Sequence, residues 1–275
     1  MSSIKLFRGG FGHVSVLNVM SDLVTHAHPE AHVIIWLEGA TGRMTVGDQP
    51  VALGPGLAVG INSLEPHSHA FASDGRPGLF LAFYIDPDWA RLRRGLPAGA
   101  PLFADPAIPM DAWLHRAARH LFDNLCDESG LGDLVDYEIE RFIDCLFDAA
   151  EPGRRRAPRG YGAGASRDFR VRKAIELMQA NICERICFDD VARKVGLSRA
   201  HFFSLFKEQM QLTPNVYWNT LRMEEARRQL QTSQDSLISV ACNLGFTTPG
   251  NFSRFFRDHV GVPPIQYREA ARAPW

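Results

Sequence analysis

The C-terminal part of the chain contains one sequence pattern twice, and this repeat constrains the fold more than any other feature. The first copy runs from Phe188 to Tyr217 and the second from Leu237 to Tyr267. In each copy a glycine, Gly196 or Gly245, precedes a segment whose apolar residues have helical spacing. Two short helices joined by a sharp turn account for such a pattern, so we expect two helix-turn-helix units at about residues 188–210 and 237–260.

Charge divides the chain into two unlike parts. Residues 1–152 carry ten lysines and arginines against twenty aspartates and glutamates, a net charge of −10, whereas residues 153–275 carry twenty against eleven, a net charge of +9. A basic part that carries helix-turn-helix patterns is typical of a phosphate-binding surface, while an acidic part is repelled by DNA. We therefore expect double-stranded DNA to bind the basic part.

The N-terminal part has a different periodicity. Up to about residue 87, short apolar segments such as Val33–Leu37 and Leu79–Ile85 alternate with turn residues, which is typical of a small β-barrel or sandwich. From Asp111 onward, apolar residues beginning with Trp113 recur at three- and four-residue steps and predict two amphipathic helices. These helices either pack on the barrel or also join two copies of the chain, and the sequence favours neither alternative.

Each second helix of the repeat combines an apolar stripe with a polar face. Ser198 and Thr248 are the expected N-caps, and the buried stripes are Phe202, Leu205 and Phe206 in the first unit and Phe252, Phe255 and Phe256 in the second. The opposite faces supply the expected DNA-binding residues: Arg199, Ala200, Phe203, Ser204, Lys207, Gly250, Asn251, Ser253, Arg254 and Arg257. Arginine reads guanine and asparagine reads adenine in the major groove. The alternative is that both helices only pack, but two units on the basic part disfavour it.

Residues 167–270 resemble the DNA-binding domain of the AraC/XylS family of transcription regulators, through VARKVGLSRAHFFSLFK and VACNLGFTTPGNFSRFFRDHVGVPPIQYR. The resemblance implies an all-α, homeodomain-like fold with a long connecting helix, here Pro214 to Gln231. It also implies a DNA contact by Arg254. Phe203 and Ser204 depart from the family, which often has polar or basic residues there. We therefore expect the second unit to supply most of the hydrogen-bonded readout and Phe203 to contact a thymine methyl.

Histidines gather in the acidic part. His26, His28 and His32 share one parity and lie on one face of an extended strand. Their spacing resembles the first cupin motif, with His32 in place of its glutamate, and His67 fits the second. The resemblance implies an all-β cupin-like barrel, followed by the two helices, in a multidomain chain. The expected effector-binding residues are His26, His28, His32, Trp36 and His67, with Phe80 and Phe83 as further apolar lining.

A metal in this barrel is the open question. His26, His28, His32 and His67 could bind zinc, nickel or iron. The missing glutamate favours a metal-free pocket, so no cofactor is expected. The domain division that follows is a cupin-like sensor at 1–150, a flexible basic linker at 151–166 and the DNA-binding domain at 167–270.

The leading hypothesis is a transcription regulator that is not an enzyme and is controlled by a small-molecule effector. It is expected to be an activator, as most of the resembling family are, with RNA polymerase and a second copy of the chain as further partners and no membrane. Five cysteines without a CxxC pair, and no apolar stretch near the N-terminus, favour the cytoplasm. The alternatives are a cupin metalloenzyme, such as a dioxygenase or isomerase, with an attached DNA-binding domain, and a scaffold that binds a protein through residues 111–149.

Overall fold

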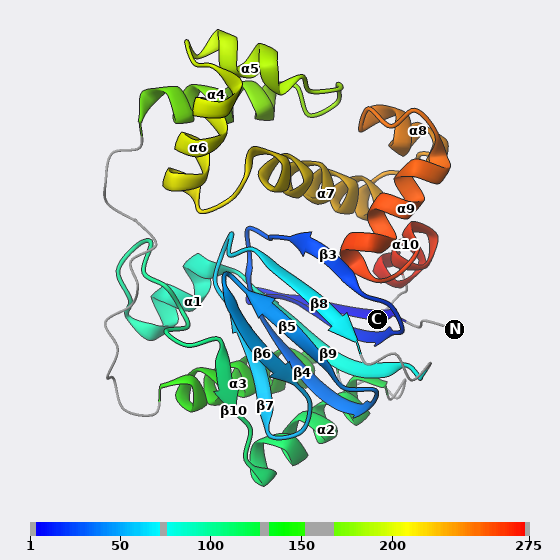
Figure 1. Cartoon of the computed structure of the whole chain (residues 1–275). Helices are drawn as coiled ribbons and strands as arrows, with labels where there is room; N and C mark the ends of the chain where they lie inside the picture. Colours follow the sequence, from blue (N-terminus) through cyan, green and yellow to red (C-terminus); the bar gives the residue numbers. More distant parts are fainter. Residues whose placement is uncertain (1–3, 72–75, 127–131, 152–167, 273–275) are drawn as a thin grey trace.

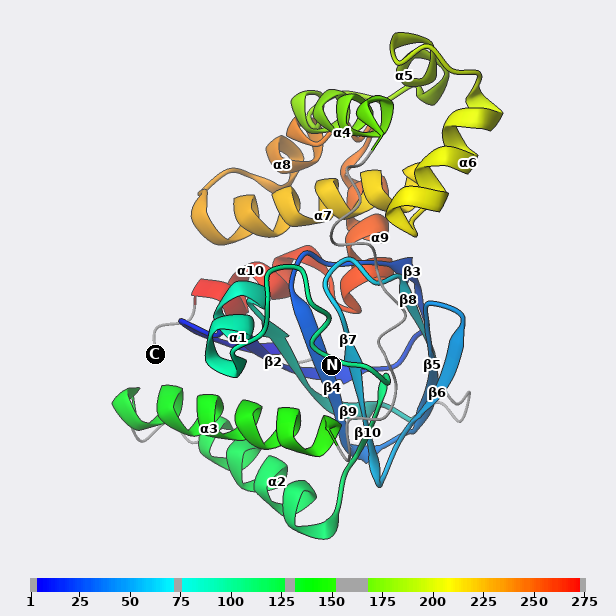
Figure 2. The same cartoon turned by 90° about the vertical axis from the view of Figure 1, so that its left-hand side faces the viewer.

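A β-barrel, the helices that follow it and a second, C-terminal group of helices make up the described part of the chain, and the C-terminal group lies across one end of the barrel (Figures 1 and 2). The computed structural model describes residues 4–71, 76–126, 132–151 and 168–272. The N-terminal β-rich fold with following helices and the all-helical C-terminal fold confirm the predicted fold class. Residues 152–166 of the predicted linker lie outside the described residues.

The barrel consists of two antiparallel sheets. The strands are β1 (Ile4–Gly9), β2 (Gly12–Val19), β3 (Leu23–His26), β4 (Ala31–Gly39), β5 (Gly42–Val46), β6 (Gln49–Leu53), β7 (Leu57–Ile61), β8 (His67–Phe71), β9 (Gly78–Ile85) and β10 (Ala107–Pro109). One sheet has the order β1-β2-β9-β4-β7-β10 and the other β3-β8-β5-β6. In β5, Met44 and Val46 are buried while Arg43 and Thr45 are exposed. This alternation places one face of the smaller sheet in the barrel interior and the other toward solvent.

The larger sheet is buried on both faces because helices cover its outer side. Helices α1 (Pro87–Arg94), α2 (Ala112–Cys126) and α3 (Gly132–Ala150) follow the strands. Leu114 of α2 and Ile139 of α3 belong to one apolar cluster with Val33 of β4, so both helices pack on the barrel, and a further role in joining two copies stays a prediction. Trp113 was expected in the apolar stripe, and this was wrong: it lies in the first turn of α2 and is 58% exposed.

The C-terminal helices follow the predicted repeat. They are α4 (Phe169–Ala180), α5 (Phe188–Lys194), α6 (Arg199–Met210), α7 (Pro214–Thr232), α8 (Leu237–Asn243), α9 (Pro249–Val260) and α10 (Pro264–Arg272). Gly196 and Gly245 at the two turns have φ of 75° and 71°, a left-handed conformation that favours glycine. The expected caps also form: Ser198 accepts from the His201 amide, and Thr248 accepts from that of Asn251. The long connecting helix is α7.

The barrel interior and the second helix-turn-helix unit share one apolar core. Ile34 and Phe80 from the barrel belong to the same cluster as Met223 of α7, Phe256 of α9 and Tyr267 of α10. In both views α9 and α10 lie against the end of the barrel (Figures 1 and 2). The two parts therefore pack together directly, which the charge division did not predict. Among the described residues, no helix has the length and apolar character that crossing a membrane requires.

Candidate functional site

Helix α6 presents most of its expected DNA-binding residues to solvent. Arg199, Ala200, Ser204 and Lys207 are exposed, while Phe202 and Phe206 are buried. The Ser198 cap sets the start of the helix and hence which side chains face outward. The polar face on α6 is therefore available for a partner as the sequence predicts.

Phe203 is the exception on α6. It is half-buried, with its ring edge-on to Phe188 at 5.6 Å and to Phe202 at 5.8 Å. The Arg199 guanidinium lies 5.3 Å from the Phe203 ring centroid and forms an ion pair with Asp189 at 2.6 Å. Phe203 thus packs inside the first unit as well as facing outward, and its contact with a thymine methyl stays a prediction. Arg199 and Phe203 of α6 are already held by contacts within the protein.

The hydrogen-bonding side chains of α9 are held by fewer contacts within the protein than Arg199 and Phe203 of α6. Gly250, Asn251, Arg254 and Arg257 are exposed and Ser253 is half-buried. Asn251 Nδ2 donates to Thr247 Oγ1 at 3.3 Å, and the Arg254 guanidinium has no hydrogen-bond partner within the described part of the chain. Such a side chain is free to reach a base edge or a phosphate.

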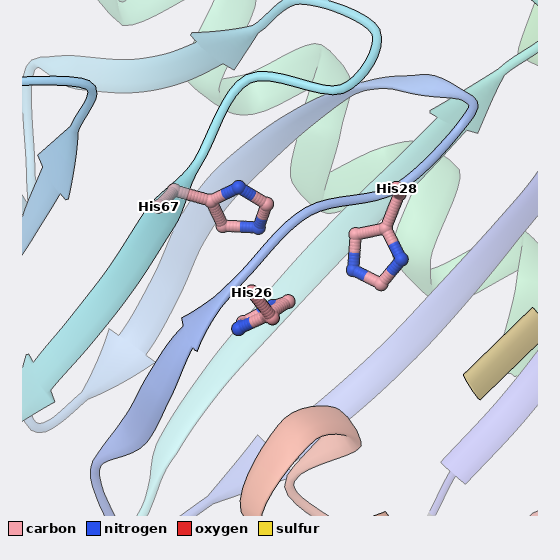
Figure 3. A group of neighbouring side chains, drawn as sticks. All are labelled: His26, His28 and His67. Carbon is pink, nitrogen blue, oxygen red and sulfur yellow. The ribbon is translucent and has the colours of Figure 1, made fainter. Parts of the chain in front are cut away.

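The predicted histidines come together at the end of the barrel that α7 and α9 cover. His26 lies at the end of β3, His28 in the following loop, His32 on β4 and His67 on β8, and all four are at most 3% exposed. Figure 3 shows the rings of His26, His28 and His67 gathered between β3, this loop and β8. His32 Nε2 and His67 Nε2 are 3.1 Å apart and share a hydrogen bond. The prediction of one strand face was wrong, because His26, His28 and His32 lie on β3, in the following loop and on β4, but their side chains still meet in one buried cluster.

Burial keeps these imidazoles uncharged near neutral pH. It lowers the pKa of His26, His28, His32 and His67 well below the ordinary histidine value, and the neighbouring imidazoles lower it further. Burial also lowers the pKa of His69, which joins the cluster from β8, to about 4. Neutral imidazoles keep a lone pair and are the form that binds a ligand proton or a metal.

Two aromatic residues do not line the expected pocket. Trp36 lies four residues along β4 from His32, roughly 13 Å at the usual strand rise, and its ring stacks near His115 of α2 at 6.1 Å. Phe83 packs outward against Phe142 of α3, with ring centroids 5.5 Å apart. The structure thus places neither side chain in the histidine cluster, because both positions are set by contacts with the outer helices.

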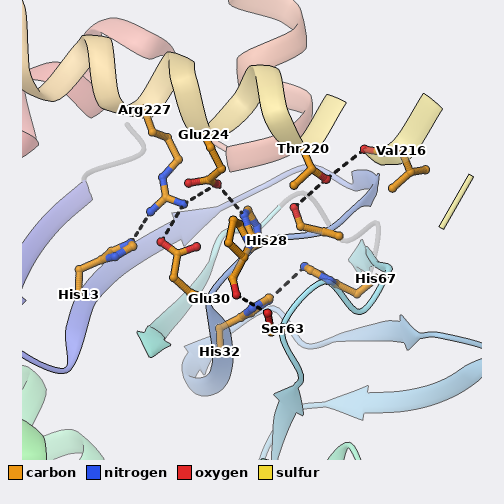
Figure 4. Close-up of polar contacts among 12 residues, drawn as sticks. His13, His28, Glu30, His32, Ser63, His67, Val216, Thr220, Glu224 and Arg227 are labelled. Carbon is orange, nitrogen blue, oxygen red and sulfur yellow. Dashed lines mark hydrogen bonds and ion pairs between the residues drawn. The ribbon is translucent and has the colours of Figure 1, made fainter. Parts of the chain in front are cut away.

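A charged network joins α7 to the barrel beside the histidines (Figure 4). Arg227 donates from Nη2 to His13 Nε2 at 2.8 Å and from Nη1 to Glu224 Oε1 at 3.1 Å, and lies 3.8 Å from Glu30. Glu224 Oε1 in turn lies 3.5 Å from His28 Nδ1. A cavity of about 230 Å³ beside this network is lined by Arg8, His13, Glu30, Glu224, Arg227 and Gln231.

Four residues of this region were not predicted from the sequence: Arg227, Glu224, Glu30 and His259. For Arg227 a signal exists, because it lies four residues after Met223 and three before Leu230 and so belongs to the buried stripe of α7. An arginine in a buried stripe requires a partner. His259 continues the stripe of α9 in the same way, seven residues after Phe252. Nothing in the local pattern identifies the strands that these side chains meet.

The residues fit a metal ion in part. His26, His28 and His67 each offer a nitrogen, and these atoms all lie within 4.8 Å of one another. Two buried nitrogens of the cluster, His28 Nδ1 and His32 Nδ1, have no hydrogen-bond partner among the described residues. An all-imidazole set suits zinc, nickel or copper, and a bound ion would act there as a Lewis acid and a crosslink.

The comparisons with known proteins agree with both halves of the fold. Residues 191–270 match the family model described as a helix-turn-helix domain, and residues 16–84 match the cupin domain. The chain is 25% identical over 247 residues to the HTH-type transcriptional activator RhaS of Citrobacter koseri, covering 90% of this chain and 88% of that protein. It is 23% identical to RhaS of Klebsiella pneumoniae, covering 99% and 98%.

A solved structure supports the arrangement of the whole chain. ToxT from Vibrio cholerae, in a structure described as bound to an unsaturated fatty acid, is similar with a TM-score of 0.54 and 14% identity, over 95% of this chain and 96% of ToxT. The curated relatives are transcription regulators and not enzymes, so the metalloenzyme alternative gains no support. The chain belongs to the AraC family of DNA-binding transcription regulators, with an N-terminal cupin domain and a C-terminal helix-turn-helix domain.

Proposed function

We propose that this regulator is an activator whose binding to a specific promoter sequence is controlled by a small-molecule effector in the N-terminal barrel. The observation that carries the proposal is the apolar core that Phe80 of the barrel shares with Phe256 of α9. A ligand at this end of the barrel would have to move α7 or α9 or be accommodated by them. Effector occupancy and the placement of a recognition helix are then thermodynamically linked.

The effector site in this proposal comprises His26, His28, His32 and His67, together with the adjoining cavity beside Arg227. The RhaS relatives are named activators, which supports the direction of control. A bound fatty acid in ToxT supports a small organic effector in a chain of this architecture. The proposal retains residues 1–150 as sensor, 151–166 as linker and 167–270 as DNA-binding domain. It also places the protein in the cytoplasm, with RNA polymerase as a partner and a second copy of the chain as a dimer partner.

In this proposal α6 and α9 enter neighbouring segments of the major groove. The full-length protein should bind the promoter of an adjacent gene with an affinity that falls steeply and linearly in a plot of log affinity against log salt concentration. Fluorescence anisotropy with labelled promoter DNA, repeated with candidate effectors, measures this dependence. A salt-independent affinity would contradict DNA binding through phosphate contacts. An affinity that no candidate effector changes would contradict only the proposed control of DNA binding by an effector.

Arg254→Ala should weaken specific DNA binding by about 1 to 3 kcal/mol, because its free guanidinium is the contact we assign to a guanine. Phe203→Ala should change base preference less, since Phe203 already packs on Phe188. Arg193→Ala, which removes an exposed arginine of α5, is the matched control and should have little effect. Anisotropy titrations over a panel of single-base promoter variants test this, and an equal change of preference for Phe203→Ala and Arg254→Ala would contradict the unequal roles.

A further inference from the structure

A cleft of about 400 Å³ lies between the two helix-turn-helix units, and none of the residues that line it comes from the barrel. In Figure 1 the loop between α4 and α5 extends toward α8, on the side of α7 that faces away from the barrel. The two units meet at Gly245, where an added Cβ would lie only 3.0 Å from the Glu184 carbonyl oxygen. Side chains of both units and of the connecting helix line the cleft, among them Arg185, Phe188, Trp218, Arg222, Phe246 and Asn251.

Arg222 of α7 is half-buried in the wall of this cleft. Its guanidinium lies 3.8 Å from the Phe246 ring centroid, and Nε and Nη2 donate to the Leu244 carbonyl oxygen at 3.1 and 2.8 Å. No residue in the described part of the chain accepts a hydrogen bond from Nη1 or forms an ion pair with this side chain. Burial and the nearby charge of Arg185 lower the pKa of Arg222 to about 10, so the side chain stays charged at neutral pH. A charge withdrawn from water calls for a counter-ion.

Arg185 brings a second unpaired cation to the same cleft. It lies exposed in the loop between α4 and α5. Its side chain has no hydrogen-bond or ion-pair partner among the residues that the structure describes, and Glu184, which also lines the cleft, pairs with neither arginine. Two like charges near one another repel, and an anion bound beside both relieves the repulsion. The charges and free donors of the cleft therefore suit one anionic group.

The position of the cleft favours a DNA phosphate as this anion. Thr247 and Asn251 line it as well, and Asn251 lies on α9, which the proposed function places in the major groove. Two recognition helices in neighbouring segments of the major groove leave a stretch of DNA backbone between them. Because DNA carries one negative charge per about 1.7 Å of its axis, unpaired cations beside a recognition helix meet phosphates.

We propose that the cleft between the two units binds a DNA phosphate from the backbone between the two major-groove segments, with Arg185 as the main contact and Arg222 as a second donor. Arg222 also holds the Leu244 carbonyl at the turn before α9, so the bound phosphate fixes one unit relative to the other on DNA. A phosphate contact adds affinity and register without base preference, in contrast to the role of Arg254. The proposal rests on the proposed function only in requiring promoter binding.

Arg185→Ala should reduce the slope of log affinity against log salt concentration by about 1, because one phosphate contact is lost. The loss of affinity should be the same for the promoter and for its single-base variants. Arg185→Lys keeps the charge and should retain most of the slope, and Arg193→Ala, which removes an exposed arginine of α5, is the matched control and should leave it unchanged. Anisotropy titrations of the full-length proteins with labelled promoter DNA at several salt concentrations measure these slopes.

Ethylation interference locates the phosphate. Ethylation of a phosphate between the two major-groove segments should weaken binding of the original protein, and this effect should disappear for Arg185→Ala while the effects at other phosphates remain. An unchanged salt slope, an unchanged interference pattern or an altered base preference for Arg185→Ala would overturn the proposal and leave promoter binding by the original protein in place. Absence of salt-dependent promoter binding by the original protein would instead contradict the proposed function, and this proposal with it.

Discussion

Arg227→Ala should lower the free energy of unfolding by about 3 kcal/mol, because it leaves two half-buried acidic partners and the buried His13 without the cation that they contact. The Arg227 side chain is only 7% exposed and connects Glu224 of its own helix with Glu30 and His13 of the barrel. Its Nε also donates to the Tyr267 hydroxyl at 3.1 Å. The loss should therefore affect the attachment of α7 and α10 to the barrel together.

The neighbouring Arg228 provides the matched control. Its side chain is 63% exposed and pairs with Glu225 on the surface, and such pairs contribute about 0 to 1 kcal/mol. Urea unfolding followed by tryptophan fluorescence and by circular dichroism measures both variants. Equal midpoints for Arg227→Ala and Arg228→Ala would contradict a structural role of the buried network. The double variant Arg227→Met with Glu224→Gln should recover part of the loss, since it removes charges of both signs.

Periodicity and turn chemistry were sufficient to predict the individual elements. Gly196 and Gly245 identify the turns, Ser198 and Thr248 the caps, and α7 ends one residue beyond the predicted helix. These features depend on residues near one another in sequence. Trp113 was misassigned because its spacing matches the stripe of α2, while its place in the first turn of the helix leaves it in solvent.

Only part of the candidate site could be predicted from the sequence, because a local pattern does not show which distant segments meet. His26, His28 and His32 lie within seven residues of one another, so the sequence indicated that they group together, although β3, a loop and β4 supply them rather than one strand. His259 and Arg227 reach the same region from distant helices, and Arg227 is separated from its partner His13 by 214 positions in the sequence. Their partners depend on how the helical part docks on the barrel, which no local pattern encodes. A buried charged side chain within an apolar helical stripe was the one available signal.

Phe256→Ala should destabilise the chain by about 3 to 5 kcal/mol, the usual loss for a buried phenylalanine, and should do so across both parts. Phe256 is fully buried, lies 5.3 Å from the Tyr267 ring and belongs to the cluster that includes Ile34 and Phe80 of the barrel. A cavity here removes contacts from α9, α10 and the barrel at once. The equivalent position of the first unit, Phe206, is equally buried and provides the matched variant.

Phe206→Ala should cost a similar amount but in a different place. The described residues around Phe206 belong to the first unit and to α7, and they include only Ala27 and Leu64 from the barrel. Amide hydrogen exchange should therefore show lost protection in α4, α5 and α6 for Phe206→Ala, and in α9, α10, β1 and β3 for Phe256→Ala. Identical exchange patterns would mean that the two units are attached to the barrel alike. Distinct patterns would mean that the two copies of the repeat have different roles, since the second copy shares a large apolar core with the barrel while the first meets it through Ala27 and Leu64.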